Sequence, residues 1–109
     1  MKESLHFARH KKTIHMIKRH EEFRLVVKSS LHVPDTLIAK IPLADLSFVS
    51  LSNKKTKLKS IEFSLNHSTR IESLLVDKEK KEITLEFNEN KEVLSFTSKE
   101  WNEILSFIH

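Results

Sequence analysis

One stretch near the end of the chain decides the fold: Phe96-Thr97-Ser98-Lys99-Glu100-Trp101-Asn102-Glu103-Ile104-Leu105-Ser106-Phe107-Ile108. Its first residues have the features of a helix N-terminus. Thr97 and Glu100 have the spacing of a capping box, in which each side chain accepts a hydrogen bond from a backbone N–H of the first turn. Phe96 and Trp101 have the spacing of a hydrophobic staple. The stretch therefore predicts a helix over residues 98–108.

The apolar residues of this helix repeat with a 3.6-residue period, at Trp101, Ile104, Leu105 and Ile108. Such a face must be buried on another layer, and Trp101 is expected in the core. The preceding segments alternate apolar and polar residues, as strands with one wet and one buried face do. We expect an α+β fold, mostly antiparallel β, in which about eight short strands form a bent sheet or barrel capped by the helix.

Alternation predicts strands at residues 13–18, 23–28, 37–41, 46–51, 61–65, 70–76, 82–87 and 92–96. Residues 1–12 are expected to form a basic arm or a short edge strand. A turn is expected at residues 19–22, a basic loop at 52–59, and a helical turn at 42–45 is an alternative start for the segment after Pro42. The chain contains no Gly, so Asn90 is the residue expected in left-handed geometry at the last turn.

Composition limits both the class of protein and its chemistry. A chain of 109 residues with 39% hydrophobic and 31% charged residues is expected to be a single globular domain. It has no apolar run of membrane-spanning length and no apolar region of a secretory signal at its start, so an intracellular location, cytoplasmic or nuclear, is expected. The absence of Cys excludes disulfides and thiolate sites. The absence of Gly argues against phosphate-cradling loops and dinucleotide fingerprints, so no cofactor is expected.

No motif of an enzyme or metal site stands out. His6 and His10 have the i, i+4 spacing of helical metal ligands, but their segment lacks a helical apolar stripe, and a solvated basic segment is the preferred interpretation. The carboxylates of Glu100 and Glu103, like other carboxylate pairs, are expected on a solvated surface. We therefore expect a non-enzymatic protein without a bound metal.

Charge is distributed unevenly along the chain. Residues 1–60 contain 13 Lys and Arg against 5 Asp and Glu, whereas residues 61–109 contain 6 against 10. An anionic partner would therefore meet the first half, and the alternative is a merely soluble surface. The candidate anion-binding residues form two clusters, Lys11, Lys12, Lys18, Arg19, Arg24 and Lys28 near the first hairpin and Lys54, Lys55, Lys57 and Lys59 in the middle loop.

Two segments resemble parts of pleckstrin-homology domains. Residues 40–49, Lys-Ile-Pro-Leu-Ala-Asp-Leu-Ser-Phe-Val, resemble their middle strands, and residues 100–105, Glu-Trp-Asn-Glu-Ile-Leu, resemble their final helix. The resemblance implies a binding or adaptor module whose phosphate-binding residues lie around the first hairpin, here Lys18 and Arg24. The chain has one predicted strand more than that family. The partner expected for this chain is a phosphoinositide, a nucleic acid, a phosphopeptide or a protein.

A second resemblance, of the last four predicted strands and the helix, rests on Phe96-Thr97-Ser98-Lys99-Glu100-Trp101 alone. This end of the chain looks like that of Whirly and positive-cofactor-type coactivators. It implies the alternative function, binding of single-stranded nucleic acid across a sheet.

Overall fold

Two antiparallel sheets and a C-terminal helix make up the computed structural model, which describes residues 3–29, 36–46, 55–59, 71–87 and 89–108. The first sheet contains, in order, β1 (Ser4–Ala8), β2 (Lys12–Arg19), β3 (Glu22–Ser29) and β4 (Thr36–Pro42). The second contains β5 (Lys55–Lys59), β6 (Ser73–Asp77), β7 (Glu82–Phe87) and β8 (Asn90–Ser95). Helix α2 spans Ser98–Ile108. The expected mostly antiparallel fold with a closing helix is thus confirmed.

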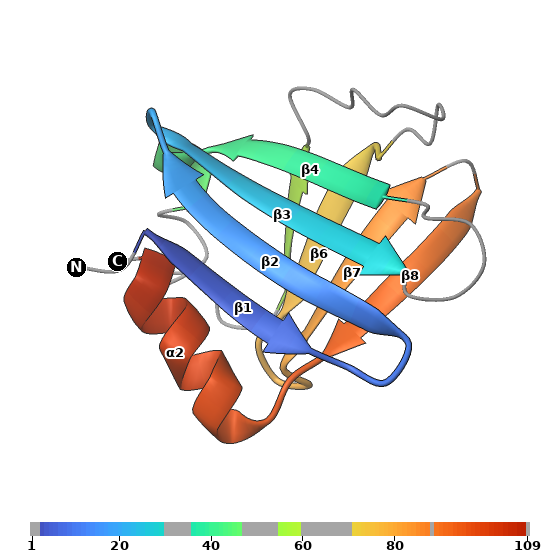
Figure 1. Cartoon of the computed structure of the whole chain (residues 1–109). Helices are drawn as coiled ribbons and strands as arrows, with labels where there is room; N and C mark the ends of the chain where they lie inside the picture. The colour runs from blue at the N-terminus through green and yellow to red at the C-terminus, as the bar shows by residue number, and fades with distance from the viewer. Residues whose placement is uncertain (1–2, 30–35, 47–54, 60–70, 88, 109) are drawn as a thin grey trace.

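The sheets pack as two layers, with the first in front of the second and α2 beside β1 (Figure 1). Within each sheet every strand pairs with its neighbour in sequence, so both are simple meanders. No pairing between described strands joins the two sheets. Closure into a barrel is therefore not confirmed.

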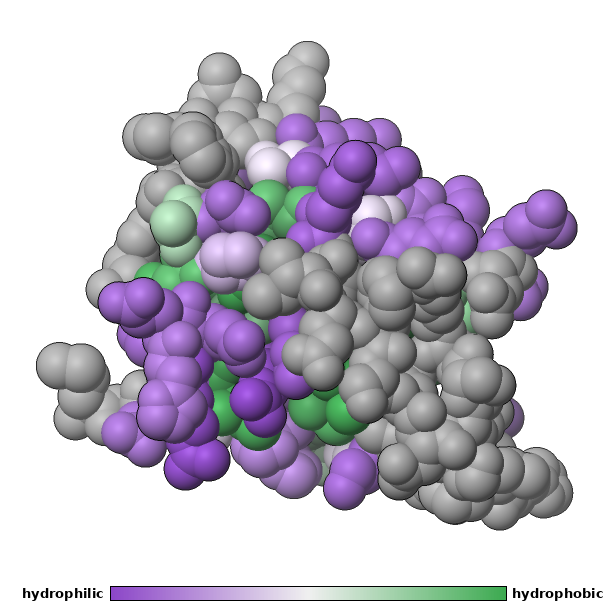
Figure 2. All heavy atoms as spheres, turned by 90° about the horizontal axis from the view of Figure 1, so that it is seen from above, coloured by the Kyte–Doolittle hydropathy of each residue, from purple (hydrophilic) through white to green (hydrophobic). Residues whose placement is uncertain are grey.

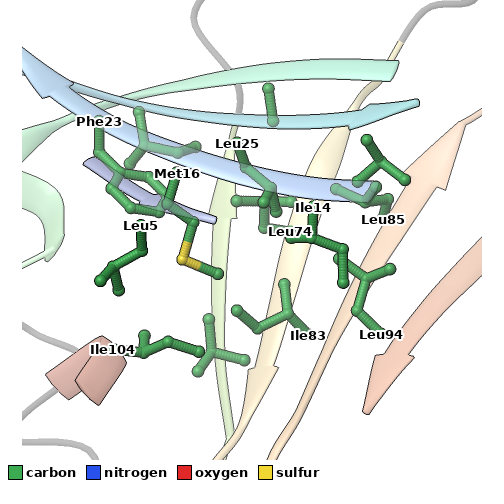
Figure 3. Close-up of a cluster of buried hydrophobic side chains, with 14 of the residues drawn as sticks. Leu5, Ile14, Met16, Phe23, Leu25, Leu74, Ile83, Leu85, Leu94 and Ile104 are labelled. Atoms are coloured by element: carbon green, nitrogen blue, oxygen red, sulfur yellow. The ribbon is translucent and has the colours of Figure 1, made fainter. Parts of the chain in front are cut away.

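The hydrophobic core lies between the two sheets and the helix. Figure 3 shows Ile14 and Leu25 of the first sheet beside Leu74 and Leu85 of the second, and Leu5 on the side of the helix. From the helix, Ile104 reaches the same space (Figure 3). Each strand contributes alternate residues to this core because successive side chains of a strand point to opposite faces.

Helix α2 begins as its sequence predicts. The Thr97 N–H donates to Glu100 Oε1 over 3.0 Å, and the Glu100 N–H donates to Thr97 Oγ1 over 3.1 Å, which confirms the capping box. The Phe96 and Trp101 rings pack with their centroids 6.0 Å apart, as the staple requires. The buried face differs in one respect, since Phe107 is buried whereas Leu105 and Ile108 are only partly buried. The helix is rotated so that Phe107 packs on Phe23 of β3, with centroids 6.4 Å apart.

The segment after β4 departs from the expected strand. Residues 43–46 are helical, in agreement with the alternative of a helical turn after Pro42, and Leu46 is buried. The expected strand at 46–51 is therefore wrong at Leu46, and its remaining residues lie outside the described part of the chain, as does the expected strand at 61–65. The expected basic loop at 52–59 is also wrong for Lys55–Lys59, which form the edge strand β5.

Left-handed backbone at the turns falls on residues with large side chains. His20 and Glu21 have φ values of 51° and 63° in the two-residue connection between β2 and β3. Lys81 has φ 56° before β7, and Glu89 has φ 63° before β8. The expected left-handed residue Asn90 instead begins β8 and pairs with Phe87, so the left-handed position lies one residue earlier.

Candidate basic face of the first sheet

The outer face of the first sheet carries the side chains that alternate with the core residues of β2, β3 and β4. In β2, Ile14 and Met16 are buried, so His15 and Ile17 between them point outward. In β3, Leu25 and Val27 are buried, and Arg24, Val26 and Lys28 point outward by the same alternation. We call this surface the basic face and define it by Arg19, Arg24, Lys28 and Lys40 together with His15, Ile17, Val26 and Ile38.

Strand pairing places the cations of the basic face in three rows across the sheet, with Arg19 in the first, Arg24 and Lys40 in the second, and Lys28 in the third. Arg24 of β3 lies between Ile17 of β2 and Lys40 of β4. Lys28, four residues further along β3, lies opposite Thr13. Since a strand rises roughly 3.4 Å per residue, Arg24 and Lys28 are about 13–14 Å apart along β3. The two cations therefore stand on either side of the middle of the face.

The middle of the basic face is aliphatic. Val26 lies between His15 of β2 and Ile38 of β4, and Ile17 is its diagonal neighbour. Val26, Ile38 and Ile17 are all half-buried, so part of each side chain is accessible to solvent. The face thus combines a small apolar centre with charged residues around it.

A carboxylate lies at one end of the face. Arg19 is directly opposite Glu22, and the Arg24 Nε–H donates to Glu22 Oε2 over 3.3 Å. The Arg24 side chain is 37% exposed, so this ion pair is open to water and its guanidinium has further N–H donors for a ligand.

His15 adds a titratable group to the basic face. It pairs across the strands with His6 of β1, and the two ring centroids are 5.3 Å apart. Partial burial lowers the pKa of His15, and the nearby His6 and Lys28 lower this pKa further. His15 is therefore held in its neutral form to lower pH than a free histidine. The i, i+4 pair considered from sequence is not formed on a helix, because His6 lies in β1 and His10 follows it.

Two of the sequence-predicted anion-binding residues point away from this surface. Lys12 Nζ donates to Glu92 Oε1 of β8 over 3.0 Å. Lys18 Nζ donates to the Phe107 carbonyl at the end of α2 over 2.7 Å and lies 5.2 Å from the centre of the Phe107 ring. Both lysines share the inward face with Ile14 and Met16, and each joins the first sheet to another layer.

The other predicted residues are divided among several places. Arg19, Arg24 and Lys28 lie on the basic face, and Lys11 is exposed in the connection between β1 and β2. Lys55 and Lys57 lie on β5 in the second sheet, where Lys57 Nζ is 3.4 Å from Glu86 Oε1. Lys54 lies outside the described residues. Of the two positions that the pleckstrin-homology resemblance offers for phosphate, Arg24 lies on the basic face and Lys18 does not.

The second sheet differs from the first in its charge balance. Its outer face alternates both signs across neighbouring strands, with Lys55, Lys57, Lys59 and Lys91 against Asp77, Glu82 and Glu86. The Ser73 hydroxyl donates to Glu86 over 2.8 Å, and this bond, with the nearby Lys57 and Lys91, lowers the pKa of Glu86 despite some desolvation. Lysines on β5 also suit an edge strand, because charge there discourages pairing with other chains. The excess of cations over carboxylates is therefore larger on the first sheet, where the described strands place four cations and one carboxylate on the outer face, against four and three on the second.

Sequence reasoning missed Lys40 and His15 as members of the face. Both could have been found from the period-2 pattern. Lys40 lies between the buried Ala39 and Ile41, and His15 between Ile14 and Met16, so each must point to the opposite side from the core.

Arg9 joins the start of the helix to the end of β1. Its guanidinium donates to both carboxylate oxygens of Glu100, over 3.0 and 2.9 Å, and to the Ser95 carbonyl over 3.1 Å. It also lies 5.8 and 5.6 Å from the ring centres of Phe7 and Phe96. The expected solvated carboxylate surface holds for Glu103, which is exposed, whereas the Glu100 side chain is 22% exposed and pairs with Arg9.

Other features of the described residues are not arranged as a site. An apolar cavity of about 20 Å³ lies between α2 and the second sheet, bordered by Trp101, Ile104 and Leu74 among others. This volume has room for about one water molecule. Among the described residues, no three His, Asp or Glu side chains are placed to share a metal ion. No helix in this part of the chain is long and apolar enough to cross a membrane.

Seen from above, hydrophilic residues dominate the described surface, with hydrophobic residues visible between them (Figure 2).

Comparisons of this chain with protein-family models, curated proteins and solved structures found no match.

Proposed function

We propose that this chain is a non-enzymatic binding module of pleckstrin-homology-like type that holds an anionic partner on the basic face. The observation that carries the proposal is the contrast between the two sheets. Arg19, Arg24, Lys28 and Lys40 share the outer face of the first sheet with a single carboxylate from its described strands, whereas the second sheet alternates both signs. A concentration of one sign of charge on a flat surface attracts the opposite charge and speeds encounter.

The architecture supports the same class of module. Two antiparallel meanders closed by a C-terminal helix provide a rigid scaffold, and the helix is fixed by Arg9 and Lys18 rather than left available for a ligand. Arg24, which the family resemblance offers for phosphate, lies on the basic face beside Lys40. The fourth strand in the second sheet remains the departure from that family.

The test compares two variants that remove equal charge from different surfaces. Arg24→Gln/Lys40→Gln removes two cations from the basic face without placing like charges opposite each other. Lys80→Gln/Lys99→Gln removes two exposed cations from the β6–β7 turn and from α2. Binding to labelled polyglutamate, single-stranded DNA and phosphoinositide vesicles is measured at low and physiological salt.

We expect at least one polyanion to bind at low salt, with a loss of about tenfold in the basic-face variant and little change in the control. Circular dichroism shows that both variants are folded. Equal losses in the two variants would mean that only net charge matters. That result, or no binding to any of the probes at low salt, would disprove the proposal.

A further inference from the structure

The arrangement of the basic face carries information about its partner beyond charge. Arg24 and Lys28 lie two residues on either side of Val26, and all three point outward from β3. Val26 pairs with Ile38 of β4, and Ile17 of β2 extends this apolar centre diagonally. The face therefore alternates cation, aliphatic centre and cation along one strand.

We infer that the partner of the basic face is an acidic protein segment in extended conformation, with an aliphatic side chain two residues from an acidic one on each side. This inference rests on the proposed function and specifies its ligand. Residues i, i+2 and i+4 of an extended segment point to one face and span the same 13–14 Å or so as Arg24 to Lys28. The aliphatic residue of the segment then meets Val26 while its carboxylates meet the two cations.

The chemistry of the centre favours protein over nucleic acid. Proteins that bind single strands stack bases on aromatic or Arg planes. The centre of this face is instead built mainly from Val26, Ile38 and Ile17, whose branched side chains offer no plane for stacking, and the half-buried His15 ring beside Val26 packs against the His6 ring. An apolar centre with a charged border is the usual composition of an interface between proteins.

The same centre argues against a lipid surface. Membrane-binding surfaces insert large apolar side chains below the headgroups. Here the aliphatic residues are half-buried within a sheet, whereas Arg19 and Lys28 around them are exposed. A flat, extended peptide can reach both kinds of side chain at once, whereas a membrane would contact mainly the charges.

Three labelled peptides test this inference. The first carries Glu-Thr-Ile-Thr-Glu, the second replaces Ile by Ser, and the third has the first composition with both Glu residues placed together at one end. At physiological salt we expect the first peptide to bind about tenfold more tightly than either of the others, since only it combines the apolar contact with the charge spacing. Amide chemical shifts should change in β2, β3 and β4.

Protein variants separate the two parts of the recognition. Val26→Thr keeps the branched shape but makes the centre polar, and should remove the preference for Ile over Ser while binding of the Ser peptide is unchanged. Arg24→Gln/Lys28→Gln should weaken all three peptides. The control Lys80→Gln/Lys99→Gln should leave the order of the peptides unchanged.

The outcomes distinguish this inference from the proposed function. Equal affinity for all three peptides would overturn the inference. Binding of single-stranded DNA or phosphoinositide vesicles through Arg24 and Lys40, with no preference among peptides, would also overturn it but would leave the basic face as an anion-binding site. No binding of any probe at low salt would disprove both.

Discussion

Arg9 and Glu100, 91 positions apart in sequence, are joined by two parallel hydrogen bonds of 3.0 and 2.9 Å. Glu100 simultaneously accepts the Thr97 N–H of the capping box. One carboxylate thus completes the start of α2 and attaches it to the end of β1. Because the Arg9 guanidinium also packs on Phe7 and Phe96, it closes this side of the core as well as neutralising the charge.

We predict that Arg9→Met lowers the free energy of unfolding by about 1–2 kcal/mol. A bidentate, half-buried ion pair that also contacts two aromatic rings should contribute more than an ordinary surface pair. Arg9→Lys should restore little of this, because an ammonium cannot bond both carboxylate oxygens in the same plane. Urea unfolding measures the change. The control is Lys11→Ala, an exposed neighbour expected to cost less than about 0.5 kcal/mol. Equal effects at the two positions would contradict the prediction.

The Arg9 and Glu100 pair also predicts acid sensitivity. Burial raises the pKa of Glu100, but the Thr97 N–H and Arg9 outweigh burial and lower it from its usual value of 4.5. The folded state therefore releases this proton more readily than the unfolded state. The stabilisation is complete above about pH 4.5 and is lost as the pH falls through the lower, folded pKa. Urea unfolding between pH 6 and 3 should show a shallower decline in Glu100→Gln than in the wild type. Parallel declines would contradict the assignment.

Local signals predicted the parts of the fold that depend on neighbouring residues. The bounds of α2 follow from Thr97, Glu100 and the apolar period, and β7 follows from alternation at Ile83, Leu85 and Phe87. The strand Lys55–Lys59 was missed because only Leu58 in it is clearly apolar. Such a sequence resembles a solvated loop unless its position at the edge of a sheet is known.

The candidate site was only partly predictable for a different reason. Counting charges showed that the first half of the sequence is the more basic one, but it did not show which face of a strand each charged side chain lies on. Lys18 and Arg24 were grouped because both lie near the first hairpin, yet Lys18 shares the face of the buried Met16 and Arg24 does not. The period-2 alternation of each strand is enough to place Lys18 on the core face and Arg24 on the outer face. The contact of Lys18 with the end of α2 could not be predicted, because it depends on how the helix packs.

We predict that substitutions in the turn between β2 and β3 can make the protein more stable. His20 and Glu21 both adopt positive φ, which costs free energy for residues with a Cβ atom and is typical of a two-residue hairpin turn that favours Asn-Gly. His20→Asn/Glu21→Gly should raise the free energy of unfolding by about 1 kcal/mol. Thermal and urea unfolding provide the measurement. Lys80→Gly is the control, since Lys80 is exposed in a turn without positive φ and Gly there should destabilise. A destabilised double variant would show that positive φ at His20 and Glu21 does not limit stability.

Lys18 should affect stability and not binding. Its ammonium bonds the Phe107 carbonyl at the C-terminus of α2, where positive charge is favourable, and lies against the Phe107 ring. Lys18→Met keeps an apolar side chain but loses the charge, and should lower the free energy of unfolding by about 1–2 kcal/mol. Affinity for an anionic probe should remain near that of the wild type, in contrast to Arg24→Gln. A loss of binding in Lys18→Met without a loss of stability would return Lys18 to the binding surface.

Binding on the basic face should strengthen as the pH falls from 6.5 toward the lowered pKa of His15, because His15 then gains charge next to Val26 and Lys28. Its pKa in the free protein is lowered from 6.5 by partial burial, His6 and Lys28. The unfolded chain therefore takes up the proton first, and the stability of the free protein is greatest above pH 6.5 and declines as the pH falls. An acidic partner opposes this decline by favouring the charged imidazole. As the pH falls, the affinity for the partner therefore rises while the stability of the free protein declines.

Affinity for the Glu-Thr-Ile-Thr-Glu peptide is measured between pH 7.5 and 5.5. It should rise in the wild type as the pH falls and stay flatter in His15→Gln, with His10→Gln as the control for an exposed histidine outside the face. The same rise in His15→Gln as in the wild type would show that other histidines, and not His15, sense the pH.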